Sequence, residues 1–350
     1  MADDAQYMRR AMELACLGLG EVSPNPMVGC VVVHNDRIIG EGWHQKFGEA
    51  HAEVNAIKNV KDHSLLSSAT VYVNLEPCSH FGKTPPCADL LIEKKVRRVV
   101  IANRDTNPQV AGAGIEKMKA AGMEIEEGVC QEEGRWVNRR FFTRVEESIP
   151  YIILKWAQSA DKKIAPSDGK SIWISNAHSR QRVHQWRTQE DAVLVGSRTA
   201  EVDNPHLNVR DWTGRNPVRV VIDPSLRLDS KLHLFDGTQP TLRYNRITDE
   251  GLTVETRIRI DGEDLIPAIL ADLNSRNISS VIVEGGLHTL QGFITGGWWH
   301  EARIFQSPRT LGGGIQAPQV SGVLNGQEEI SGDQLSVWIN PERVRTAPGG

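Results

Sequence analysis

Short apolar segments typical of strands alternate with amphipathic segments typical of helices along most of this chain. In the first half, for example, the strand patterns at 70–73 and 99–102 are separated by helical patterns. Such alternation predicts an α/β domain in which helices cover a largely parallel sheet. Ser148-Ile149-Pro150 interrupts the alternation, which then starts again. We therefore expect two α/β domains, covering residues 1–147 and 150–350.

The first domain is expected to have three layers. Apolar residues recur at helical spacing from Met8 to Cys16, so an N-terminal helix should bury this stripe, with Cys16 as an inert core thiol. Asn35-Asp36 between two apolar runs predicts a hairpin turn. Further helices are expected from near His51, after Pro86, at 114–121 and, as a single element, at 131–142, with a short strand at 123–125.

The second domain repeats this organisation with different spacing. Its predicted strands are 151–154, 192–196, 218–222 and 280–283, and its predicted helices are 178–188, 265–275 and one that begins at Leu287.

Composition excludes several classes of protein. The 350 residues carry 40 basic and 44 acidic side chains, so the net charge of −4 offers no field that would attract nucleic acid. No apolar run approaches the roughly 18 residues of a membrane span, and Met1-Ala2-Asp3-Asp4 lacks the features of a signal peptide. Five cysteines in a chain of this length do not form a disulfide framework. A cytoplasmic enzyme is expected.

The strongest chemical signal is His51-Ala52-Glu53 followed by Pro77-Cys78 and Cys87. One imidazole and two thiolates form a standard three-ligand zinc set, which leaves a fourth position for water. A glutamate two residues after the histidine suits proton transfer to and from that water. Cys87 lies where a helix should begin, and a helix N-terminus favours the thiolate form. The pattern predicts one catalytic Zn²⁺, with Glu53 as the catalytic acid and base.

The spacing of the two cysteines distinguishes this chain from most zinc nucleobase deaminases, whose second motif is Pro-Cys-x-x-Cys. Here eight residues, 79–86, separate Cys78 from Cys87. Two alternatives remain open from the residues alone. One is a zinc deaminase of nucleosides or nucleobases with a ligand-binding second half. The other is a structural zinc adaptor in which His44 or His80 completes a closed four-ligand site.

The second half lacks the Gly-x-Gly-x-x-Gly fingerprint of a Rossmann domain. Instead, the strand at 281–283 leads through Gly285-Gly286 into a helix. Such a turn lets backbone N–H groups approach a phosphate, and the helix dipole favours the anion.

Three segments together resemble the bifunctional deaminase–reductase family of riboflavin biosynthesis. They are 24–29 (Pro-Asn-Pro-Met-Val-Gly), 51–53, and 76–87 with its long insert between the cysteines. In the second half, 196–210 is similar to the family's central reductase motif. The resemblance covers nearly the whole chain. It implies a cytidine-deaminase-like first domain and a dihydrofolate-reductase-like second domain that uses NADPH.

For the first domain the resemblance implies hydrolytic deamination of 2,5-diamino-6-ribosylamino-4(3H)-pyrimidinone 5′-phosphate. Zinc held by His51, Cys78 and Cys87 would activate the water, and Glu53 would move its proton. The substrate contacts that the family pattern implies are Asn25, His44, Lys83, Asp105 and Asn107. Lys83 would be a partner for the phosphate.

For the second domain the resemblance implies reduction of the ribosyl group to ribityl, with Lys155 presented to the substrate. The implied NADPH contacts are Ala157, Trp173, Thr199, Asp203, Gly286, Leu287, His288, Thr289, Leu290, Gln291 and Gly292. The implied substrate contacts are Ser171, Arg187, Leu207, Arg210 and Glu284, in which the two arginines suit a sugar phosphate. The partner is a small molecule, without nucleic acid or membrane, and a homo-oligomer is expected.

The chain departs from the family pattern at two places. Lys162 stands where family members usually have a glycine, at a position expected to need a positive φ. His300-Glu301 replaces a common Asp-Glu pair. Neither change removes a residue assigned to chemistry.

Overall fold

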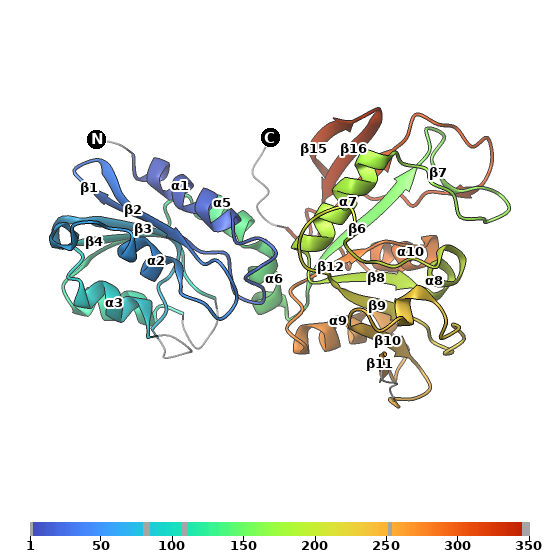
Figure 1. Ribbon diagram of the computed structural model, residues 1–350, viewed down its shortest axis with the longest axis horizontal. Coiled ribbons are helices and arrows are strands. Elements are labelled where there is room, and N and C mark those ends of the chain that lie inside the picture. Colours follow the sequence, from blue (N-terminus) through green and yellow to red (C-terminus); the bar gives the residue numbers. More distant parts are fainter. Residues whose placement is uncertain (1–2, 80–84, 107–110, 251–253, 345–350) are drawn as a thin grey trace. The chain divides into compact units, whose positions relative to one another are not determined.

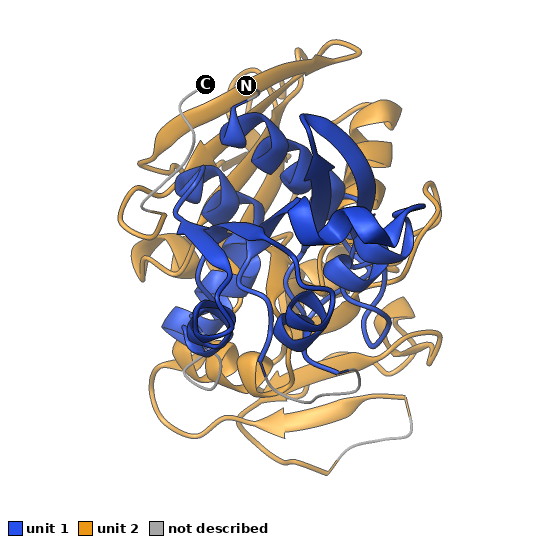
Figure 2. Ribbon diagram, turned by 90° about the vertical axis from the view of Figure 1, so that its left-hand side faces the viewer, with its two compact units in different colours: residues 1–148 blue, residues 149–350 orange. Residues whose placement is uncertain are grey.

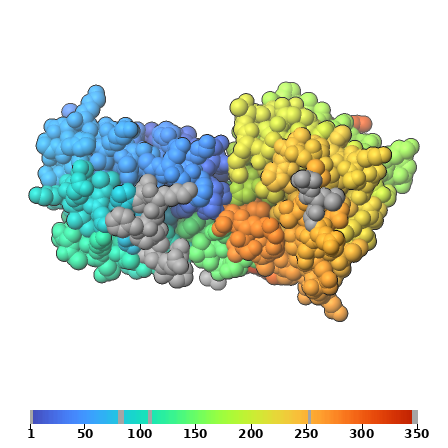
Figure 3. All heavy atoms as spheres, turned by 60° about the horizontal axis from the view of Figure 1, so that its bottom comes forward, coloured from blue at the N-terminus to red at the C-terminus, as the bar shows by residue number. Residues whose placement is uncertain are grey.

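The computed structural model describes residues 3–79, 85–106, 111–250 and 254–344. The chain divides into two compact units, residues 1–148 and 149–350, which Figure 2 colours separately. Figure 3 shows them as spheres, the first in blue to green and the second from green through yellow to red. In the described part of the chain, no helix combines the length and the apolar character needed to cross a bilayer.

The first unit is built on a five-stranded sheet in the order β2-β1-β3-β4-β5. The hairpin of β1 and β2 is antiparallel, β1 pairs antiparallel with β3, and β3, β4 and β5 are parallel. The strands are β1 (Gly29–His34), β2 (Arg37–Trp43), β3 (Thr70–Leu75), β4 (Arg98–Asn103) and β5 (Glu124–Glu127), and the helices are α1 (Asp4–Cys16), α2 (Ala52–Lys58), α3 (Cys87–Glu93), α4 (Ala113–Ala120), α5 (Gln131–Val137) and α6 (Arg139–Glu147), with a 3₁₀ turn at His63–Ser68.

Alternate residues of the central strands face two different cores. On β1, Val31 and Val33 pack with Met8 and other residues of α1, whereas Val32 packs with Ala56 and other residues of the opposite layer. Helices α2, α3 and α4 contribute to this second core, so the expected three layers are confirmed (Figure 1). The predicted hairpin turn is also confirmed, because Asn35 and Asp36 both have positive φ.

Two predictions for this unit are wrong. The helix expected at 131–142 is two helices, because Asn138 leaves the helical conformation and its buried side chain bonds to the backbone of Met27. Cys16 is exposed and is not a core thiol. It is the last residue of α1, where the buried stripe has already ended at Ala15.

The second unit contains a nine-stranded sheet in the order β11-β10-β9-β8-β12-β6-β13-β16-β15, within the described residues. Its neighbours are parallel from β11 to β13, and β16 and β15 add an antiparallel hairpin. The strands are β6 (Tyr151–Gln158), β8 (Ala192–Gly196), β9 (Val218–Ile222), β10 (Thr241–Asn245), β11 (Thr256–Arg259), β12 (Ser280–Val283), β13 (Glu301–Gln306), β15 (Val323–Ile330) and β16 (Asp333–Ile339), while β7 (Lys163–Ala165) and β14 (Ile315–Gln316) form a separate pair.

Helices cover both faces of this sheet. Residues of α7 (Ala177–Gln189) and α8 (Ser197–Asp203) pack on one face, and residues of α9 (Leu265–Ser275) and α10 (Leu287–Thr295) pack on the other; a 3₁₀ turn at His233–Phe235 adds to the first face. The predicted strands at 192–196, 218–222 and 280–283 and the helix at 265–275 are confirmed residue for residue.

Lys162 has φ +59°, so the positive φ expected at this position is confirmed for a residue with a full side chain. It lies in the turn between β6 and β7, and its backbone N–H donates to the carbonyl of Ser159. The turn therefore keeps its conformation without the glycine.

Candidate active sites

The first site forms where the N-terminus of α2 meets the N-terminus of α3. His51 is the N-cap of α2, and Cys87 is the first residue of α3. Nδ1 of His51 lies 3.6 Å from Sγ of Cys78 and 3.3 Å from Sγ of Cys87. Ligand atoms around a tetrahedral zinc ion lie about 3.3–3.8 Å apart, as its bond lengths require. The three residues therefore fit Zn²⁺ by donor type and by spacing.

The local structure favours the thiolate form of Cys78. The backbone N–H of Cys87 donates to the sulfur of Cys78 over 3.3 Å, so the start of α3 faces that sulfur. The hydrogen bond with the Cys87 thiol, opposed by burial and helped by His51, lowers the pKa of Cys78, and the same hydrogen bond together with burial raises the pKa of Cys87. A thiol that ionises this readily is a prepared metal ligand.

Glu53 is the second residue of α2, and its exposed fraction is 3%. Burial, together with the nearby Cys78 sulfur, raises the pKa of Glu53 to about 7. A carboxyl group with such a pKa can both accept and return a proton near neutral pH. Its position beside the three ligand residues suits the role expected from the sequence.

Asn25 and His44 are brought together next to this cluster. The Asn25 amide donates to Nε2 of His44 over 3.2 Å, and Nδ1 of His44 lies 3.1 Å from the carbonyl of Ala50. Burial lowers the pKa of His44, so the ring is neutral and donates from Nδ1. The His44 and His51 rings contact edge to face with centroids 5.4 Å apart.

The loop that carries Asn25 is fixed by two buried asparagines that the sequence analysis did not single out. The backbone N–H of Met27 donates to the side chain of Asn138, and the Met27 carbonyl accepts from both Asn138 and Asn74. These bonds measure 2.8–3.0 Å. No local pattern reveals them, because Asn138 is more than 100 residues away from the loop.

Asp105 lies beyond the end of β4, and its N–H donates to the side chain of Glu76. Lys83 and Asn107, also expected as substrate contacts, lie outside the described residues. Among the described residues, His51, Cys78 and Cys87 form the only group of three or more His, Cys, Asp or Glu placed to hold a metal. His44 is not part of that group, and His80 lies outside the described residues.

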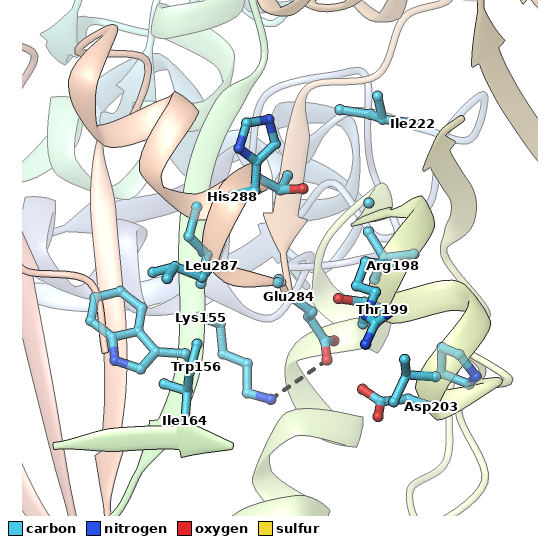
Figure 4. A pocket seen from close by; sticks show the side chains of 18 of the residues that line it. Lys155, Trp156, Ile164, Arg198, Thr199, Asp203, Ile222, Glu284, Leu287 and His288 are labelled. Atoms are coloured by element: carbon cyan, nitrogen blue, oxygen red, sulfur yellow. Dashed lines mark ion pairs between the residues drawn. The ribbon is translucent and has the colours of Figure 1, made fainter. Parts of the chain in front are cut away.

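The second site is a cavity of about 1320 Å³ in the second unit. It collects residues from the ends of β6, β8 and β12 and from the helices that follow β8 and β12 (Figure 4). Every residue that the sequence predicted for the reductase lines it: Lys155, Ala157, Ser171, Trp173, Arg187, Thr199, Asp203, Leu207, Arg210, Glu284 and 286–292.

Lys155 and Glu284 face each other within this cavity, with the ammonium nitrogen 3.5 Å from a carboxylate oxygen (Figure 4). Arg187 donates to both oxygens of the same carboxylate, through hydrogen bonds of 2.9 and 3.0 Å. Burial opposes the ionisation of Glu284, but the two cations outweigh it and lower its pKa to about 2. The cavity therefore contains a fixed carboxylate with an ammonium group beside it.

The guanidinium of Arg187 donates hydrogen bonds to the carboxylate of Glu284 and to the carbonyl of Asn208. Arg210 differs, because its side chain is 44% exposed and its nearest carboxylate oxygen, on Asp211, lies 3.9 Å away. His184, which the sequence analysis did not single out, is buried beside both arginines; its Nδ1 lies 3.4 Å from the Arg210 backbone N–H. Burial and the two arginines lower the pKa of His184 to about 4.

Where β8 ends, the chain packs closely against α10, which lines another part of the cavity. A Cβ on Gly196, at the end of β8, would lie 2.3 Å from the hydroxyl of Thr289 on α10. Gly286 is the N-cap of α10, so the first N–H groups of this helix border the cavity. Trp173 is 65% exposed at the rim, and the guanidinium of Arg180 lies 4.7 Å from its ring centroid.

Comparisons with known proteins agree for both halves. The family described as RibD C-terminal domain matches residues 150–335, and the cytidine and deoxycytidylate deaminase zinc-binding region matches residues 1–103. The riboflavin biosynthesis protein RibD of Aquifex aeolicus is 39% identical, with 89% of each chain covered. The corresponding protein of Escherichia coli is 36% identical, with 88% of this chain and 89% of that protein covered.

A solved structure leads to the same result. The diaminohydroxyphosphoribosylaminopyrimidine deaminase/5-amino-6-(5-phosphoribosylamino)uracil reductase of Thermotoga maritima superposes with a TM-score of 0.88 at 37% identity, and the match covers 96% of this chain and 98% of that one. These matches confirm the resemblance, with a cytidine-deaminase-like first domain and a reductase second domain. They exclude both a mere ligand-binding module in the second half and a structural zinc adaptor. The chain belongs to the RibD family of bifunctional deaminase/reductases of riboflavin biosynthesis.

Proposed function

We propose that the first domain (1–147) deaminates 2,5-diamino-6-ribosylamino-4(3H)-pyrimidinone 5′-phosphate and that the second (150–350) reduces the deaminated product with NADPH. The observation that carries this proposal is the separation of two different site chemistries. A set of three zinc-ligand residues with a buried glutamate lies in one unit, and a large cavity that contains Lys155 and Arg210 lies in the other.

In the deaminase site, zinc held by His51, Cys78 and Cys87 would activate water for attack on the ring carbon that bears the amine. Glu53 would accept one proton of that water and deliver it to the ring nitrogen, and would then move the second proton, from the added hydroxyl group, to the amine that departs as ammonia. Its pKa of about 7 suits both directions of transfer. Asn25 and His44, joined by their hydrogen bond, would orient the pyrimidine together with Asp105, Lys83 and Asn107.

In the reductase site, NADPH would supply the hydride that converts the ribosyl group into ribityl. The N–H groups at the start of α10 would bind phosphate oxygens of the cofactor, as helix N-termini do. The remaining contacts to NADPH would come from residues on the cavity wall: Ala157, Trp173, Thr199, Asp203 and 287–292. Lys155 would lie against the sugar, because Glu284 holds its ammonium group inside the cavity.

The two arginines receive different roles in this proposal. Arg210 is more exposed, and within the described parts of the chain no carboxylate lies closer to it than 3.9 Å, so it would bind the substrate phosphate. Arg187 would act mainly by fixing Glu284, whose carboxylate occupies its guanidinium. Ser171 and Leu207 would complete the substrate contacts.

A cytoplasmic location and a homo-oligomer also belong to this proposal. Light scattering on the purified chain tests the oligomeric state.

The test is to incubate the zinc-loaded chain with the diaminopyrimidine phosphate while ammonia and NADPH absorbance are followed separately. We expect ammonia release without NADPH, and NADPH oxidation only after deamination. If a nucleoside or single-stranded DNA releases ammonia faster than this substrate does, the assignment of the substrate is wrong.

A further inference from the structure

Glu76 is a buried carboxylate two residues before the zinc ligand Cys78, and it is 4% exposed. Its two oxygens accept four backbone N–H groups. One oxygen accepts from Asp105 and Gly112, at 3.2 and 3.0 Å, and the other accepts from Gly114 and Ile115, at 3.0 and 3.3 Å. All four donors belong to the segment that follows β4 and enters α4.

The loop from Glu76 to Cys78 also contacts the end of β4 and the start of α4 in two other places. The N–H of Glu76 donates to the carbonyl of Asn103 at the end of β4, over 2.9 Å. A Cβ on Gly114 would lie 2.1 Å from the carbonyl of Pro77, so the start of α4 rests directly on the zinc-ligand loop. Glu76 therefore fixes Asp105 and the first turn of α4 relative to each other.

We propose that Glu76 is a positioning residue of the deaminase. It fixes Asp105 relative to Cys78, and so determines how tightly the pyrimidine binds beside the metal. This inference rests on the proposed function, because Asp105 is a substrate contact only there. Glu76 itself has its four acceptor positions filled by the backbone, so it acts through Asp105 and not on the reacting atoms.

The chemistry requires a carboxylate at this position. An ionised carboxylate has about four lone-pair sites and no donor, which matches four converging N–H groups. Two of the donors, Gly114 and Ile115, lie in the first turn of α4, where the helix dipole also favours a negative charge. A glutamine of the same shape would turn an NH₂ group toward two N–H donors and leave them unsatisfied.

The experiment compares Glu76→Gln with wild type in the full, zinc-loaded chain, using the diaminopyrimidine phosphate. We expect KM for deamination to rise about tenfold or more while kcat changes less than about threefold, because contacts made equally in ground and transition states affect KM alone. The visible absorption of the cobalt-substituted variant should match wild type. Reduction of the deaminated substrate by NADPH should be unchanged.

Glu93→Gln is the matched control, because Glu93 ends α3 in the same unit and its side chain is 70% exposed. It should leave KM unchanged. Glu76→Asp, a second variant, keeps the charge but loses reach, and it should give a KM between wild type and Glu76→Gln. An unchanged KM in both Glu76 variants, or a loss of the cobalt spectrum in parallel with activity, would overturn the inference. Failure of wild type to release ammonia from this substrate would instead contradict the proposed function.

Discussion

Arg187 donates two hydrogen bonds to the carboxylate of Glu284, at 2.9 and 3.0 Å, and both side chains are 9% exposed. A guanidinium fork that matches a carboxylate in this way is already satisfied before any ligand binds. Lys155 approaches the same carboxylate from within the cavity. The pair therefore links the fold of the second unit to the placement of its candidate catalytic lysine.

Arg187→Ala should destabilise the second unit by about 3–5 kcal/mol, because it leaves a buried carboxylate with only one cationic partner. Arg187→Lys keeps the charge without the two parallel bonds and should cost less. Urea unfolding followed by tryptophan fluorescence measures both. Equal stability of wild type and Arg187→Ala would contradict the view that this pair is structural.

The same pair predicts a dependence on pH. Burial works against the charged form of Glu284, but Arg187 and Lys155 lower its pKa from 4.5 to about 2. A pKa lower in the folded state contributes stability above pH 4.5, which is lost as the pH falls toward 2. The difference in unfolding free energy between wild type and Arg187→Ala should therefore shrink over this range. A difference that stays constant from pH 6 to pH 2.5 would contradict the prediction.

Gly196→Ala should weaken NADPH binding. The added methyl group would lie 2.3 Å from the hydroxyl of Thr289, so the Thr289 side chain must rotate, or α10 or the end of β8 must move. Overpacking of this kind typically costs about 1–3 kcal/mol, and we expect KM for NADPH to rise about five- to tenfold. Gly326→Ala in β15 is the control, because no atom lies within 4 Å of its added Cβ. Equal effects of the two substitutions on KM would show that α10 does not border the cofactor.

Removal of zinc should separate the two activities. A chelator that removes zinc from His51, Cys78 and Cys87 should abolish ammonia release. NADPH-dependent reduction of the deaminated substrate should be unchanged, because the reductase cavity contains none of these residues. Addition of Zn²⁺ or Co²⁺ should restore deamination. Ammonia release that survives complete removal of the metal would exclude the proposed chemistry.

Strongly apolar elements could be predicted from the sequence because local pattern and burial agree in them. The strand at 192–196 is buried throughout, as its composition suggests. By contrast, β10 was not predicted, because it carries Arg243, a buried cation that is stabilised by Asp223, Glu255 and the carbonyl of Leu228 from elsewhere in the fold. A tertiary ion pair of this kind leaves no local signal.

The candidate sites show the same division. His51, Cys78 and Cys87 could be recognised because zinc requires histidine and cysteine ligands, and these residues lie in the His-x-Glu and Pro-Cys motifs of zinc deaminases. The roles of Glu76, Asn138 and His184 could not be predicted, because each depends on backbone groups brought in by the fold. Likewise, the sequence marked Arg187 as suited to phosphate, whereas the structure pairs it with Glu284.

The most direct test of two independent chemistries is the Glu53→Gln variant of the full chain. Glutamine keeps the shape of the side chain but cannot accept and return the proton. We predict that the variant retains one zinc per chain and loses ammonia release by at least about a hundredfold, while it oxidises NADPH with pre-deaminated substrate at the wild-type rate. If both activities fall together while zinc is retained, the assignment of one chemistry to each domain is wrong.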